Sequence, residues 1–448
     1  MSGSTDTHTV TAPPWPLTRT LFSPFAVLLY VYVAYFALTY SRIYEYVYWE
    51  LMNLGTRIIG FHPSLETLGL YAWGAIVLAL GFVAGSLLAD RVQRSAEEPS
   101  ASTRTSVAGS LGRAREALAG LPVVRRLGLG FTVSLIGWGV GIAANGAQIV
   151  ASGTISLTDI ASRWSQSPVL VLLAATQIFF VPSLIVTARG RWQRAFSAGA
   201  FVVSILALGL LGARNLPAKL VVSGFLAIVY VVKPKTVVRL AVVFLVLLVL
   251  AMGVIGSITK SGIYGPSATA GLAVALTYSD SVGTSYNLDR IVRMTPPTGI
   301  YGGRLLYDSV LALIPGVDAE YANFQLGRYL GGREGFVIGE SNIERSVSLA
   351  PTLLGAPYAD WGIPGTAVQM LLLGGLFGYL QNRARSALLL LPFLVTMASY
   401  VINGVNAGVH NPHAIVSIVL AALVVGLDMA VLARVPVVPS TDYEVSVA

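Results

Sequence analysis

Two short polar stretches between long apolar runs carry side chains that suit proton transfer. ESNIERS, at residues 340–346, contains Glu344, and NGVNAGVHNPH, at residues 403–413, contains His410. A carboxylate or an imidazole is a suitable general base for taking the proton of a hydroxyl group. Both stretches equally suit helix capping, because short polar side chains satisfy free backbone groups at helix ends. Glu344 and His410 are therefore candidate catalytic bases, with capping as the alternative.

A third stretch, LLGARNLPAKL at residues 210–220, separates two apolar runs and carries side chains that suit anion binding. Arg214 has two interpretations: an anchor that reaches out to the membrane surface, or a clamp for a phosphate group at headgroup depth. Asn215 and Lys219 beside it favour an anionic ligand. Lys219 lies one turn into the following apolar run, where it faces other helices or reaches outward.

A long polar segment at residues 260–361 supplies further arginines. Arg290, Arg293 and Arg345 are candidate substrate-binding residues, because guanidinium groups bind phosphate or carboxylate through paired hydrogen bonds. Solvated ion pairs with acidic residues of the same segment are the plainer explanation for most of its arginines. Tyr358, near the end of the segment, is added to the candidate substrate-binding residues.

Composition decides what kind of scaffold holds these side chains. Of the 448 residues, 55% are hydrophobic and 11% are charged, whereas about a quarter of a soluble domain is charged. Long continuous apolar runs must be helices in a bilayer, since backbone polar groups find no water there. We predict an all-α, polytopic membrane protein.

A membrane span needs about 20 apolar residues, and about ten runs qualify. They are residues 21–40, 68–89, 127–151, 168–188, 195–213, 216–232, 238–259, 362–380, 386–402 and 414–433. The polar segment at 260–361 then forms one large loop between the seventh and eighth spans. Within it, residues 304–316 and 320–330 each show the periodicity of a short amphipathic helix.

Basic residues orient the spans. Arginine and lysine gather in the connections at 90–126, 189–194, 233–239 and 381–385, and a count of ten spans places all four on one side. By the positive-inside rule that side is the cytoplasm. The tails at 1–20 and 434–448 join it, so residues 21–259 hold the first seven spans, 260–361 is external, and 362–433 holds the last three. The net charge of +8 is explained by these connections and calls for no nucleic-acid partner.

The re-entry into the membrane, APYADWGIPG at residues 356–365, has its own signals. Asp360 suits a helix N-cap, and Trp361 suits the aromatic belt at the membrane surface. Gly362, Pro364 and Gly365 permit a break or a tight turn.

The sequence lacks the motifs of several common kinds of catalysis. There is no cysteine, no phosphate-binding loop and no nucleophile elbow in a convincing setting. One or two histidines do not make a metal site, which usually needs three or four ligands. The spans are nearly free of acids, whereas an ion-coupled transporter usually buries them. We expect no metal and no cofactor, and an enzyme that works at the outer leaflet without nucleotides.

Three stretches carry a resemblance. LAPTLLGAPYADWGIPGTAVQMLLLGGLFGYL at 349–380, YGGRLLYDSVLALIPG at 301–316 and LGARNLP at 211–217 resemble the oligosaccharide repeat unit polymerases, the O-antigen polymerase (Wzy-like) family. Trp361 and Gly362 stand where Phe and Gly occur in that family. The motifs cover about residues 200–380, and the first half of the chain is similar in topology alone.

The resemblance implies a substrate and a reaction. An acceptor sugar hydroxyl would attack the anomeric carbon of a polyprenyl diphosphate-linked oligosaccharide, with Glu344 or His410 as base and arginines on the diphosphate. It also implies a place in the cytoplasmic membrane among membrane lipid, with a chain-length regulator and a flippase as partners. Two alternatives stay open: an O-antigen ligase-like transferase, and a transporter of lipid-linked sugars or polysaccharide.

Overall fold

A computed structural model describes most of the apolar part of the chain. The described residues are 20–40, 64–97, 168–188, 191–210, 215–232, 236–246, 280–312, 314, 317, 319, 322, 325–326, 352–386, 390–409 and 412–434. Within these residues every regular element is a helix, so the all-α prediction is confirmed there.

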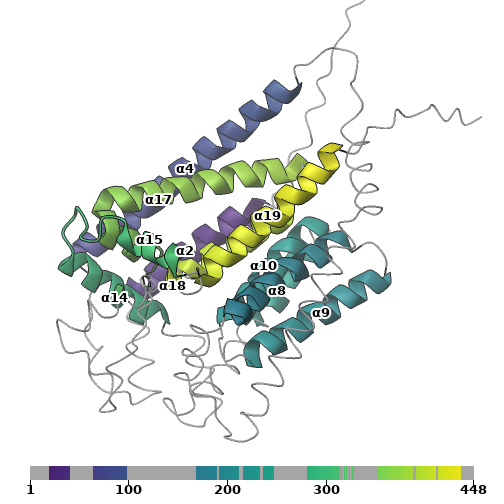
Figure 1. The fold of residues 1–448 in the computed structure, drawn as a ribbon, viewed down its shortest axis with the longest axis horizontal. Coiled ribbons are helices and arrows are strands. Elements are labelled where there is room, and N and C mark those ends of the chain that lie inside the picture. The colour runs from purple at the N-terminus through teal and green to yellow at the C-terminus, as the bar shows by residue number, and fades with distance from the viewer. Residues whose placement is uncertain are drawn as a thin grey trace, which may run out of the picture.

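Most of the described helices coincide with apolar runs of the sequence, and Figure 1 shows how they are arranged. In chain order they are α2 (Pro24–Tyr40), α4 (Leu65–Glu97), α8 (Pro168–Thr187), α9 (Arg191–Leu210), α10 (Asn215–Val231), α14 (Asp280–Met294), α15 (Arg304–Leu311), α17 (Thr352–Ser386), α18 (Leu391–Ala407) and α19 (Pro412–Arg434). A further apolar helix occupies Thr236–Val246.

Two of the described helices are both long and apolar enough to cross a bilayer. They are α4, over Leu65–Gln93, and α17, over Thr352–Ala384. The other apolar segments within α2, α8, α10, α18 and α19 are shorter, and the predicted span at 127–151 lies outside the described residues. The number of spans therefore stays a prediction.

Glycines let α4 and α17 approach each other closely. Gly81 and Gly85 of α4 lie against the backbone of α17, and Gly374 and Gly378 of α17 lie against the backbone of α4. A Cβ at any of the four would overlap a carbonyl oxygen of the other helix. Paired small residues four apart are the usual means by which membrane helices pack backbone to backbone.

The remaining apolar helices form the rest of the bundle. Helix α18 packs against α17, α2, α8, α10 and α19. Figure 1 shows α8, α9 and α10 gathered below α19, at the lower right of the view. One cluster of fully buried side chains joins these helices, with Ile178, Leu208, Leu216, Leu220 and Tyr400 among its members.

The first part of α17 lies ahead of the predicted span. That span is predicted to begin at residue 362, which is where α17 has a sharp break, and α17 itself begins at Thr352. Residues 352–360 are all buried. The predicted break among Gly362, Pro364 and Gly365 is confirmed, and a short buried helix precedes it.

Candidate functional site

The described part of the long polar segment folds onto the break in α17. Helix α14 and helix α15 both pack against α17, and the loop between them, residues 295–303, lies against the break. Figure 1 shows α14 and α15 together at one end of α17. Helix α14 was not expected from the sequence, and α15 confirms the first eight residues of the amphipathic helix predicted at 304–316.

Backbone groups of the loop replace the helical hydrogen bonds that the break removes. The amide of Ile300 donates to the carbonyl oxygen of Ala359 at 2.8 Å, and the amide of Ile363 donates to the carbonyl oxygen of Pro297 at 2.9 Å. In an unbroken helix Ile363 would donate to Ala359 instead. The loop therefore satisfies both ends of the interrupted bond, as buried backbone groups require.

Two prolines explain where the first part of α17 needs donors other than its own helical amides. Pro364 and Pro357 have no amide hydrogen, so the carbonyl oxygens of Asp360 and Leu353, four residues earlier, lose their helical donors. Gly302 donates its amide to Asp360 O at 2.8 Å, and the side-chain amide of Gln369 donates to Leu353 O at 2.7 Å.

The bond from Gln369 to Leu353 also shows how sharp the break is. In a straight helix, residues 16 apart are about 24 Å apart along the axis, beyond the reach of a glutamine side chain. The first part of α17 must therefore fold back along the second. The turn is made by Gly362 alone, with φ 67° and ψ −146°. A side chain is strained in that conformation, and a Cβ there would overlap the carbonyl group of Pro297.

Asp360 caps a helix, but it caps a different helix from the one expected. Its two carboxylate oxygens accept hydrogen bonds from the backbone amides of Leu305 at 2.9 Å and Leu306 at 3.1 Å. These are the second and third residues of α15, whose own N-cap is Gly303 with no side chain to offer. Asp360 is 1% exposed. A carboxylate from α17 thus does the work of an N-cap side chain for α15.

Beside this junction lies an open hollow of about 550 Å³. Its lining comes from the loop, from the first turns of α15 and from the break: Gly302, Gly303, Arg304, Tyr307, Asp308 and Trp361. Trp361 and Tyr307 are 41% and 63% exposed. The hollow therefore presents two aromatic rings together with one cation and one anion.

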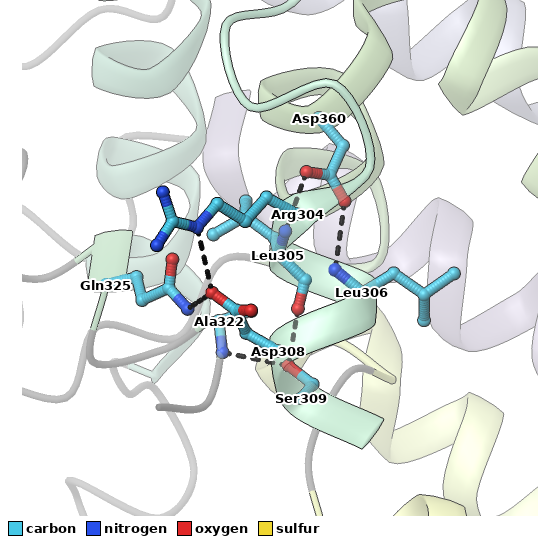
Figure 2. Close-up of polar contacts among 8 residues, drawn as sticks. All are labelled: Arg304, Leu305, Leu306, Asp308, Ser309, Ala322, Gln325 and Asp360. Carbon is cyan, nitrogen blue, oxygen red and sulfur yellow. Dashed lines mark hydrogen bonds and ion pairs between the residues drawn. The ribbon is translucent and has the colours of Figure 1, made fainter. Parts of the chain in front are cut away.

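A small polar network holds the charged wall of the hollow (Figure 2). One carboxylate oxygen of Asp308, Oδ2, accepts hydrogen bonds from Arg304 Nε at 3.3 Å and from Gln325 Nε2 at 2.9 Å. On the same helix, Ser309 accepts a hydrogen bond from the amide of Ala322 at 3.0 Å. Both contacts tie α15 to the chain that follows it.

Helix α14 carries two of the arginines that the sequence selected. Arg293 forms an ion pair with Asp289, at 2.6 Å from Nε to Oδ2, and its side chain is 56% exposed. Arg290 is buried. Asp289 is buried too, and its other oxygen accepts hydrogen bonds from Ser64 N and Thr67 Oγ1 at the start of α4. Arg293 is thus the arginine on α14 that a soluble or headgroup anion can reach.

Lys219 faces the bundle rather than the surface. It is 2% exposed, and its ammonium nitrogen lies 4.6 Å from the centre of the Tyr400 ring, a cation–π contact between α10 and α18. The Tyr400 hydroxyl accepts a hydrogen bond from Ser417 Oγ of α19 at 2.6 Å. Asn215 is the first residue of α10.

The other selected residues divide into two groups. Tyr358 is described and buried in the first part of α17. Glu344, His410, Arg214 and Arg345 lie outside the described residues. The structure therefore brings Arg290, Arg293 and Tyr358 onto two helices that pack together, and it places Lys219 in a separate part of the bundle.

The hollow was not identified as a binding site from the sequence. Its signals were present in the sequence, as a Gly-Gly pair before an amphipathic helix at residues 302–311 and as Trp-Gly-x-Pro-Gly at 361–365. Neither signal shows that the two stretches meet, because only the fold brings together residues that are more than 50 positions apart.

The comparisons with known proteins find one family. A family model described as "Putative O-antigen polymerase" matches residues 22–420, from the start of α2 into α19. The match covers most of the chain. No curated protein and no solved structure matches the chain.

Proposed function

This chain belongs to the O-antigen polymerase family, and from that premise we propose that it joins lipid-linked oligosaccharide repeat units into a longer glycan. The family is one of membrane proteins, which agrees with the apolar helices of the structure. The family name implies a glycosyltransferase-type activity on lipid-linked oligosaccharides. The proposal adds the donor, the side of the membrane and the residues.

In the proposed reaction a sugar hydroxyl of the acceptor attacks the anomeric carbon of the donor oligosaccharide. A new glycosidic C–O bond forms while the C–O bond to the diphosphate breaks, and polyprenyl diphosphate leaves with the electron pair. The hydroxyl proton passes to a base, Glu344 or His410. The reaction takes place at the outer face of the cytoplasmic membrane, where the lipid tails stay in the bilayer and both chain termini lie on the opposite side.

The main barrier is the charge that builds on the departing diphosphate, so positioned cations are the most effective catalysts. Arg293 is the best supported of them. Asp289 engages its Nε, and within the described part of the chain the terminal NH₂ groups of this half-exposed side chain stay available for phosphate oxygens. Arg214 and Arg345 are proposed to share the diphosphate with it.

The buried candidates have supporting roles in this proposal. Arg290 and Tyr358 hold the junction between α14 and α17 that presents Arg293. Lys219, one turn from Asn215, contributes positive potential from within the bundle to the same end of α10 as Arg214. A cation placed among apolar helices is costly and is usually retained for function.

The observation that carries the proposal is the family match over residues 22–420. The test is to delete the gene in the source cells and analyse lipid extracts. Loss of a polymerase leaves single repeat units on polyprenyl diphosphate, whereas loss of a ligase leaves lipid-linked polymer. Loss of a transporter leaves repeats that an added glycosidase cannot reach from outside. Accumulation of single, externally accessible repeats is the expected result, and either other pattern contradicts the proposal.

The same cells test the base. The cells are complemented with Glu344→Gln and, separately, with His410→Gln. The variant that replaces the base should leave single repeats, and the other variant should restore polymer.

A chain-length regulator and a flippase are the partners that such a pathway would need: one to set polymer length, the other to bring repeat units across the membrane.

A further inference from the structure

We propose that the hollow beside the break in α17 is a carbohydrate subsite, in which a sugar ring of the oligosaccharide stacks on Trp361 and its hydroxyl groups bind Asp308 and Arg304. This proposal rests on the proposed function, because it takes the oligosaccharide of that reaction as the ligand. It concerns binding of the glycan and is independent of which groups hold the diphosphate.

Trp361 is a fixed platform. Its ring lies directly against Gly303, where a Cβ would overlap the ring, and its inner atoms lie against Gly365, where a Cβ would be 2.7 Å from Trp361 Cβ. The absence of a side chain at both positions lets the indole settle between α15 and the second part of α17. The residue nevertheless remains 41% exposed. Because the Trp361 side chain is already ordered, it loses little conformational entropy when a ligand stacks on it.

The polar groups around the platform suit sugar hydroxyls. Among the residues that the structure describes, both side chains that donate to the Asp308 carboxylate use Oδ2, which leaves Oδ1 as an acceptor for a hydroxyl. Arg304 offers its terminal NH₂ groups from a side chain that is 74% exposed. Tyr307, 63% exposed, provides a second aromatic surface with a hydroxyl of its own.

Other ligands fit this combination less well. A phosphate or a carboxylate would be repelled by Asp308, and a metal cation would be repelled by Arg304. A lipid chain would desolvate both charges without satisfying them. A sugar ring is neutral, with hydroxyls for the charged pair and polarised C–H groups for the negative face of an indole. The volume of about 550 Å³ lies in the ordinary range for small-molecule sites, about 300–1,000 Å³.

The same contacts that form the break also fix the subsite. Gly302 donates to the carbonyl oxygen of Asp360, and the Asp360 carboxylate caps the first turn of α15. Arg304 and Asp308 are on that helix, and Trp361 follows Asp360. The platform and the polar wall are therefore held in one orientation relative to each other before any ligand binds.

The test uses the full-length chain in detergent and a probe without lipid or phosphate. Mild acid releases the free reducing oligosaccharide from the lipid-linked repeats that accumulate in cells lacking the gene. Titration calorimetry should give a Kd for the wild type that is about tenfold higher in Trp361→Ala, a factor that corresponds to about 1.4 kcal/mol. Trp361→Phe, which keeps an aromatic face, should bind more tightly than Trp361→Ala.

Two further variants and one control keep the test decisive if Trp361→Ala does not fold. Tyr307→Ala and Asp308→Asn each change one wall of the hollow and should each weaken binding several-fold. Trp192→Ala removes a tryptophan that is 87% exposed on α9, away from the hollow, and should bind like the wild type.

Failure of this proposal and failure of the proposed function give different results. If the wild type elongates lipid-linked repeats but does not bind the free oligosaccharide, or if all hollow variants bind it as the wild type does, the subsite is wrong and the polymerase proposal stands. If no lipid-linked single repeats accumulate in the deleted cells, the polymerase proposal fails and the subsite fails with it.

Discussion

Replacing Gly362 by alanine tests whether the break in α17 organises the site. The alanine methyl group would overlap the carbonyl group of Pro297, and the neighbours are backbone atoms that cannot rotate away. The residue would also have to keep φ 67° and ψ −146°, which costs a side-chain-bearing residue about 1–3 kcal/mol. Relief by moving the loop would sacrifice the bond from Ile363 N to Pro297 O, worth about 0.5–1.5 kcal/mol.

These two terms predict that Gly362→Ala lowers the free energy of unfolding by about 1.5–4.5 kcal/mol. The matched control is Gly69→Ala in α4, where a Cβ meets nothing within 4 Å. Alanine is favoured over glycine inside a helix by about 0.5–1 kcal/mol, so the control should be as stable as the wild type or more stable.

The assay is the thermal midpoint of the purified chain in detergent, measured side by side for the three proteins. Binding of the free oligosaccharide to the folded protein gives a second readout, since the break also positions Trp361. A Gly362→Ala protein that melts with the wild type and binds the oligosaccharide normally would refute the reasoning, because the backbone would then tolerate a side chain where the structure leaves no room.

Three other substitutions have expected outcomes. Asp360→Asn replaces one accepting oxygen with an NH₂ group, so one of the two hydrogen bonds that cap α15 is lost. The free energy of unfolding should fall by about 1–2 kcal/mol, and hydrogen exchange at the Leu305 amide should speed up. Unchanged exchange would contradict the cap. Lys219→Met removes a buried ammonium while keeping the length of the side chain, so the thermal midpoint should hold or rise while polymer yield falls; a clear loss of stability would show a structural role instead. Arg293→Gln breaks an ion pair worth about 0–1 kcal/mol at a half-exposed position, so the protein should stay folded while its rate of polymer formation falls at least tenfold; an unchanged rate would remove Arg293 from the diphosphate site.

Local sequence signals predicted the helices and the break well. Apolar runs must form helices in a bilayer because no other open structure satisfies the backbone, and wherever the structure describes such a run it is a helix. The break could be placed from Pro364, which removes a hydrogen bond, and from Gly362, which tolerates a turn that other residues avoid.

Contacts between distant stretches could not be predicted in the same way. Asp360 was correctly assigned to capping, but a carboxylate has no local signal for which helix it will cap, and it caps one that begins 56 residues earlier, at Arg304. Trp361 suited a membrane-surface belt equally well until its contact with Gly303 was known. Helix α14 was missed because its buried apolar residues, Leu288, Ile291 and Val292, form too short a stripe.

The most direct test of the central claim is polymerisation by the purified chain in vesicles that contain lipid-linked single repeats and no nucleotide. The account predicts a ladder of glycans that differ by one repeat unit, with one polyprenyl diphosphate released for each new glycosidic bond. Repeats that remain single in the presence of folded protein, with no diphosphate released, would contradict it.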